Sequence, residues 1–87
     1  MWSSGFYICV RGGVSASQCT VTMNVHDPRC IDALQILNGV SWSNLQGDSR
    51  TMHCSANYIV ELLQNRLWTV VTTEKADDEY VWTLCKD

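Results

Sequence analysis

The clearest hydrophobic pattern in the chain is an alternation of apolar and polar residues that begins after Gln18. The apolar members are Cys19, Val21, Met23 and Val25. Successive side chains of a β-strand point to opposite faces, so this alternation predicts a strand with one buried face. The aromatic and β-branched run 6–10 ends just before Gly12 and Gly13, which predicts an earlier strand followed by a sharp bend.

Two segments have the apolar spacing of amphipathic helices. Asp27 and Pro28 supply an N-cap and a proline at the first helical position, and Asn38 with Gly39 supplies a left-handed stop. A first helix is therefore predicted over 28–38. Ser55 can cap a second helix. The apolar stripe of this second helix contains Ile59, Leu62, Leu63 and Leu67.

The remaining segments complete the order of elements. Residues 41–48 are polar and rich in turn formers, so we expect a connection there, and 50–54 are predicted to form a short strand. Two aromatic and β-branched runs, 68–73 and 80–85, are joined by the acidic segment 74–79, which predicts a hairpin with a longer loop. The order is β-β-α-β-α-β-β. One apolar stripe per helix favours an α+β fold, a mostly antiparallel sheet with both helices on one face.

Length and composition narrow the classes of protein that fit. The 87 residues suit a single domain over 1–87, and 46% hydrophobic with 17% charged residues is typical of a folded globular chain. Six Lys and Arg against nine Asp and Glu give a net charge of −3, without a basic run that could follow a phosphate backbone. No apolar run approaches the roughly 20 residues that span a bilayer. We therefore expect neither a nucleic acid nor a membrane as a partner.

The cysteines point to a reducing setting. The odd number of five argues against a closed disulfide framework, which favours the cytoplasm, with the nucleus as another possibility. Neither C-x-x-C nor H-x-x-H spacing occurs, so no metal site or cofactor is predicted. His53 and Cys54 are neighbours and would point to opposite sides of a strand, so they do not form a catalytic dyad. A thiol enzyme that pairs Cys54 or Cys30 with His26 remains an alternative to the expected absence of catalytic residues.

Large aromatic rings are numerous for so small a core. They are Trp2, Phe6, Tyr7, Trp68, Tyr80 and Trp82. Tyr and Trp are enriched at interfaces because they bury a large area and keep a polar group, so these rings predict a sheet face or edge that self-associates. Tyr80 and Trp82 are the candidates for the oligomer interface. The alternative is that the rings fill the layer between helices and sheet.

Residues 58–73 and 80–87 align without a gap with the end of a known protein family. The matching residues are Leu63, Arg66, Val70, Val81, Trp82, Leu84 and Lys86. An acidic residue follows that lysine in both, and Asp27 with Pro28 falls where the family has an Asp-Pro pair. In these residues the chain resembles the GTP cyclohydrolase I feedback regulatory protein family. The resemblance covers nearly the whole chain with small changes in length.

The resemblance implies a non-enzymatic regulatory subunit that forms a homopentameric ring and caps the decameric GTP cyclohydrolase I. In that family, phenylalanine at the interface relieves inhibition of the enzyme, and tetrahydrobiopterin promotes it. The family has a Gly-rich hairpin turn containing Gln where this chain has 75–79, and an Ile-Arg pair where this chain has Gly12 and Gly13. An effector pocket, if kept, is expected between 11–14 and the 73–78 turn. Its candidate residues are Arg11, Gly12, Gly13, Val14, Thr73, Glu74, Asp77 and Asp78.

A second class of function stays open. Five cysteines in 87 residues also suit a small secreted effector or toxin-like protein. A thiol count under denaturing conditions separates the two classes, because four oxidised cysteines favour the secreted protein and five thiols remove it.

Overall fold

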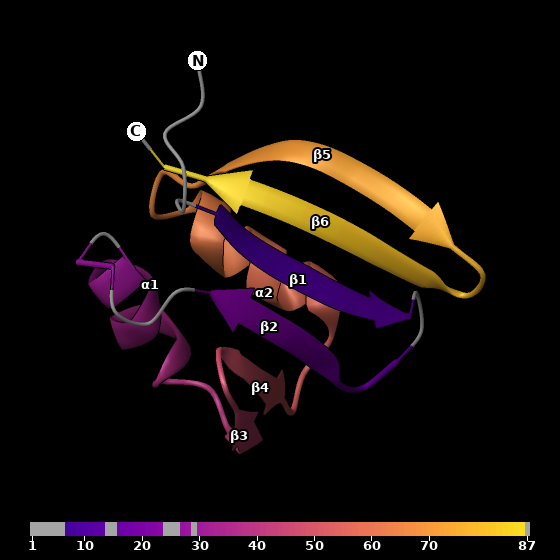
Figure 1. Ribbon diagram of the computed structural model, residues 1–87, viewed down its shortest axis with the longest axis horizontal. Coiled ribbons are helices and arrows are strands. Elements are labelled where there is room, and N and C mark those ends of the chain that lie inside the picture. Colours follow the sequence, from indigo (N-terminus) through magenta and orange to yellow (C-terminus); the bar gives the residue numbers. More distant parts are fainter. Residues whose placement is uncertain (1–6, 14–15, 24–26, 29, 87) are drawn as a thin grey trace.

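A computed structural model describes residues 7–13, 16–23, 27–28 and 30–86 of the chain (Figure 1). Two helices and six strands follow one another in this part of the chain. They are β1 (Tyr7–Gly13), β2 (Cys19–Met23), α1 (Cys30–Leu37), β3 (Trp42–Gln46), β4 (Ser49–Met52), α2 (Ala56–Gln64), β5 (Thr69–Ala76) and β6 (Glu79–Cys85). The strands form one antiparallel sheet in the order β3-β4-β2-β1-β6-β5. The predicted α+β fold is thus confirmed, with one strand more than expected.

One face of the sheet carries the hydrophobic core. Ile8 and Val10 of β1 are fully buried, and so are their cross-strand partners Leu84 and Val21. The helix residues in the same cluster are Cys30, Ala33, Leu37, Ala56, Ile59, Val60 and Leu63. Alternate residues of a strand point to one face, so both helices cover that face, as predicted. Figure 1 shows α2 crossing behind β1 and β2.

Local signals in the sequence place the helix starts. The N–H of Tyr58 donates to Ser55 Oγ at 3.2 Å, so Ser55 is the N-cap of α2, as predicted. The N–H of Cys30 donates to the carbonyl of Asp27 at 2.9 Å at the start of α1. The predicted apolar stripe of α2 is wrong at its last member. Leu67 has a φ of 72° and is 79% exposed, because the helix ends before it.

The predicted connection over 41–48 is wrong, because this segment contains strand β3. β3 pairs with β4 through a turn at Gly47, whose φ is 59°, with an irregularity between Ser43 and Gln46. β3 lies at the edge of the sheet and its side chains are mostly exposed. Main-chain hydrogen bonds hold such a strand, so its side chains need no apolar alternation.

The predicted longer loop in the acidic segment is also wrong. β5 continues to Ala76 and β6 begins at Glu79, so only Asp77 and Asp78 form the turn. Asp77 adopts a φ of 55°, which aspartate tolerates better than most residues. Asp77 and Asp78 therefore sit at the tip of a tight hairpin, whereas Glu74 lies on β5.

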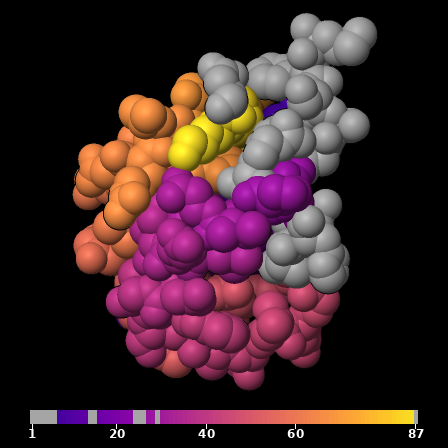
Figure 2. All heavy atoms as spheres, turned by 90° about the vertical axis from the view of Figure 1, so that its left-hand side faces the viewer, coloured from indigo at the N-terminus to yellow at the C-terminus, as the bar shows by residue number. Residues whose placement is uncertain are grey.

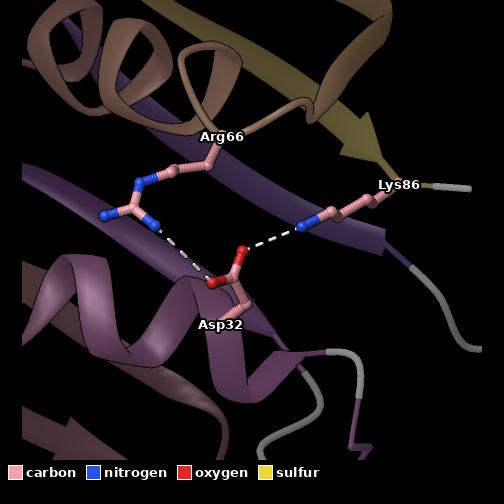
Figure 3. Close-up of polar contacts among 3 residues, drawn as sticks. All are labelled: Asp32, Arg66 and Lys86. Atoms are coloured by element: carbon pink, nitrogen blue, oxygen red, sulfur yellow. Dashed lines mark hydrogen bonds and ion pairs between the residues drawn. The ribbon is translucent and has the colours of Figure 1, made fainter.

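A cluster of charged side chains joins three separate elements. Asp32 of α1 accepts a hydrogen bond from Lys86 Nζ at 2.8 Å and lies 4.0 Å from Arg66 Nη1 (Figure 3). Lys86 follows β6, and Arg66 follows α2. In the view of Figure 2, the magenta surface of α1 lies next to the yellow C-terminal part of the chain. The cluster therefore fixes α1 against the C-terminal ends of α2 and β6.

Candidate functional site

The end of β1 and the start of β6 lie side by side. Gly12 pairs with Tyr80, and Gly13 pairs with Glu79. A cavity of about 230 Å³ opens at this place. Its lining residues are Arg11, Gly12, Gly13, Ala16, Gln18, Cys19, Thr20, Thr51 and Glu79. Three of the candidate effector residues, those of β1, therefore line one cavity.

The structure puts the other candidates elsewhere or leaves them out. Val14 lies outside the described residues. Thr73 pairs with Trp82 and Glu74 with Val81, so both lie on β5, with β6 between them and β1. Asp77 and Asp78 form the hairpin turn and do not line the cavity. The β5–β6 hairpin thus contributes to the cavity through Glu79, which was not among the candidate effector residues.

Gly12 is required by close packing rather than by the predicted bend. β1 continues through both glycines as a regular strand. A Cβ atom at Gly12 would lie 3.0 Å from the Cβ of Ala56 and 3.0 Å from the Cβ of Cys19. Such distances are shorter than ordinary Cβ contacts, so any side chain at Gly12 would have to displace Ala56 or Cys19 where β1 meets the start of α2. The prediction of a bend at Gly12 was wrong.

The chemistry of the cavity is polar. The strand register brings Arg11 beside Thr20, and Thr20 beside Thr51, on the face of the sheet away from the helices. A guanidinium, two hydroxyl groups and the Glu79 carboxylate can bind a small molecule that carries both donors and acceptors. The polar positions of the alternating segment 18–25 were the signal that could have identified Thr20.

The candidate interface rings lie on the core-facing side of β6. Tyr80 and Trp82 are stacked, with centroids 5.6 Å apart and planes at 30°. Both are partly buried, and Trp82 packs against the core cluster. Trp68 is 2% exposed, whereas Trp2 and Phe6 lie outside the described residues. Trp68 and Trp82 therefore contribute to the layer between helices and sheet, the alternative considered for the rings.

The cysteines fall into separate groups, and none of the five, all of them described, is in a disulfide. The thiols of Cys19 and Cys54 are hydrogen-bonded to each other. His53 Nε2 lies 2.7 Å from Ser43 Oγ, whereas Cys54 packs against the core cluster. β4 ends at Met52, so the predicted strand over 50–54 stops before both residues. His26 lies outside the described residues. Burial raises the pKa of Cys54, which disfavours the thiolate that a thiol enzyme needs.

Within the described ranges, no helix is both long and apolar enough to cross a bilayer. In the same part of the chain, no three His, Cys, Asp or Glu side chains gather in a way that could hold a metal ion. No protein-family model matches the chain, and no curated protein matches it significantly.

Proposed function

We propose that the chain is a non-catalytic regulatory subunit that associates with itself and with GTP cyclohydrolase I in the cytoplasm. In this proposal it mediates inhibition by tetrahydrobiopterin and stimulation by phenylalanine, as the resemblance of 58–73 and 80–87 implies. The observation that carries the proposal is the cavity between the end of β1 and Glu79. It adjoins the region in which the resemblance leads us to expect an effector.

The residues of the cavity suit an amino acid as effector. Arg11 can bind a carboxylate in a bidentate manner, and Glu79 can accept from an ammonium group. The hydroxyl groups of Thr20 and Thr51 add further donors and acceptors. The lining offers little apolar surface for a phenyl ring. A neighbouring subunit or the enzyme would therefore cover the ring, which agrees with binding at an interface.

The arrangement of layers leaves room for self-association. α1 and α2 cover one face of the sheet, and the opposite face is exposed to solvent or half-buried along β1 and β6. Val81 and Cys85 of β6 lie on that opposite face with Tyr7 of β1. A mixed apolar and polar surface of this kind is typical of protein interfaces. It is available for contact with a second copy or with the enzyme.

Light scattering behind a sizing column tests this proposal. The protein alone is expected to elute with about five times the mass of one 9.8 kDa chain. With GTP cyclohydrolase I it is expected to join the enzyme peak, and phenylalanine is expected to change the amount bound. The variant Arg11→Ala should join the peak without responding to phenylalanine, and Arg66→Ala, which lies outside the cavity, serves as the matched control. A monomer that ignores the enzyme would refute the proposal.

A further inference from the structure

Two cysteines that are distant in the sequence meet beside the cavity. Cys19 begins β2, and Cys54 follows β4 just before the N-cap of α2. Cys19 pairs with Met52, so Cys54 comes two residues after its cross-strand partner. Cys19 belongs to the core cluster, and Cys54 packs against it. The thiol of Cys19 on β2 and that of Cys54, in the connection between β4 and α2, are hydrogen-bonded to each other.

The surroundings hold this pair in place. A Cβ added at Gly12 of β1 would lie 3.0 Å from the Cβ of Cys19 and 3.0 Å from the Cβ of Ala56, two residues after Cys54. The main chain of β1 at Gly12 is therefore packed tightly against the start of β2 and the start of α2, the two segments next to these cysteines. Tight packing limits the conformations of both side chains and raises the effective concentration of one thiol at the other.

The remaining cysteines do not share this arrangement. Cys30 lies on α1. Cys9 and Cys85 lie on the opposite face of the sheet, where Cys9 pairs with Thr83, two residues from Cys85. Burial raises the pKa of Cys9, and its electrostatic neighbours are Arg11 and Glu74. Cys9 and Cys85 thus have a similar offset along the strands on the other face of the sheet, which makes them an internal comparison.

We propose that Cys19 and Cys54 form an intramolecular disulfide by exchange with a low-molecular-weight disulfide such as glutathione disulfide. The thiolate of Cys54 attacks one sulfur of glutathione disulfide, the S–S bond breaks, and one glutathione thiolate leaves and takes up a proton. Cys19 then loses its proton and attacks Cys54, and the second glutathione leaves. Two protein thiols are oxidised, and one glutathione disulfide is reduced to two molecules of glutathione.

Exposure and hydrogen bonding assign the order of attack. Cys19 is 4% exposed, whereas Cys54 is partly exposed and so accessible to the reagent. Burial raises the pKa of both thiols. The hydrogen bond between them adds to the rise at Cys19 and opposes it at Cys54, as expected when Cys19 S–H donates to Cys54 Sγ. Cys54 is therefore the attacking group and Cys19 completes the bond.

Burial affects the rate of this reaction more than its product. It raises the pKa of Cys54, and together with the neighbouring Cys54 it raises the pKa of Cys19 to about 12. Thiolates are therefore scarce at neutral pH, and exchange should speed up as pH rises. The disulfide carries no charge, so the apolar surroundings do not oppose it. Since Cys19 lines the cavity, its oxidation would alter a wall of the candidate effector site.

Peptide mapping after equilibration in glutathione buffers tests this proposal, independently of any effect on cyclohydrolase. Trypsin cleaves after Arg and Lys, which places each of the five cysteines in a different peptide. We expect peptides 12–29 and 51–66 to become linked in the native protein, and the thiol count to fall by two. Five free thiols at every buffer composition would overturn the proposal. Two further results would also overturn it. One is a Cys9–Cys85 link as abundant as the Cys19–Cys54 link, and the other is glutathione that stays bound to Cys54 while Cys19 remains a free thiol.

Matched variants complete the test. Cys54→Ser should lose the link and keep its four remaining thiols, whereas Cys85→Ser should form the link as the unmodified chain does. Cys54 is partly exposed, so its replacement disturbs the core less than replacement of Cys19. If Cys54→Ser does not fold, the map of the unmodified chain and that of Cys85→Ser still decide. Oxidation of the unfolded chain in denaturant is the control for the reagent. It should give disulfides between several different pairs of cysteines, which shows that the reagent reacts with all five.

Discussion

Replacing Leu67 by glycine is expected to stabilise the protein, although it removes a large apolar side chain. Leu67 follows α2 with a φ of 72°, in the left-handed region that glycine adopts without strain. Its N–H donates to the carbonyl of Gln64 at 3.1 Å, and the N–H of Trp68 donates to that of Leu63 at 3.1 Å. These hydrogen bonds close the helix in the manner for which glycine is usual at this position.

The size of the effect follows from two opposing terms. Left-handed backbone costs an L-residue about 1–2 kcal/mol, and this strain is released in Leu67→Gly. Glycine gains freedom in the unfolded chain, which takes back about 0.5–1 kcal/mol. The side chain of Leu67 is 79% exposed, so little burial is lost. The expected net gain is about 0.5–1 kcal/mol.

Urea unfolding followed by tryptophan fluorescence measures this gain at a single protein concentration. The midpoint should rise with an unchanged slope. Asp77→Gly is the matched control, because Asp77 also has a positive φ, of 55°, but aspartate tolerates that region. Its midpoint should move much less. A lower midpoint for Leu67→Gly, or an equal gain for Asp77→Gly, would refute the argument from strain.

Three further variants test other contacts. Gly12→Ala places a Cβ 3.0 Å from two neighbouring Cβ atoms and should lower stability by about 1–3 kcal/mol in thermal unfolding. Gly39→Ala is the control, because its added Cβ would meet its nearest neighbour at 3.4 Å and should change stability little. Equal losses in the two variants would contradict the packing argument. The hydrogen bond from Lys86 lowers the pKa of Asp32 below 3.8, so this ion pair stabilises the fold above the unfolded pKa, and the stabilisation is lost as pH falls through the lower folded pKa. Asp32→Asn should therefore make stability depend less on pH in that acidic range. An unchanged acid unfolding profile would count against this reasoning. The ring centroid of Trp42 lies 4.1 Å from the guanidinium of Arg50, a residue only 7% exposed. Trp42→Ala removes this cation–π contact and should lower the free energy of unfolding in urea by about 1–2 kcal/mol. An unchanged free energy of unfolding would show that the ring does not stabilise the Arg50 charge.

Local chemistry in the sequence predicted most of the fold. The alternation after Gln18 and the cap at Ser55 act over a few residues, so they could be recognised without a partner strand. Strand β3 and the ends of the β5–β6 hairpin could not be recognised from the sequence, because main-chain pairing with a neighbouring strand holds polar residues in these segments. The end of α2 was placed too late, since the sequence has leucine where a stop signal usually has glycine.

The candidate site was less predictable than the fold. The resemblance located the β1 side of the cavity at Arg11, but only the strand register brings Glu79 to it. The same limit applies to Cys19 and Cys54. Their contact depends on how β2 pairs with β4 and on where α2 begins, and neither fact is written in the spacing of the cysteines.

The position of β1 in the sheet has a consequence for synthesis of the protein. β1 lies between β2 and β6, and its pairing runs from Tyr7 with Cys85 to Gly13 with Glu79. A chain emerging from the ribosome can pair β1 with β2 early, but the other edge of β1 stays open until β6 has been made. Open strand edges favour wrong pairing between chains. The protein therefore completes its fold after β6 is released, and a ribosome that stalls before this point leaves an aggregation-prone intermediate.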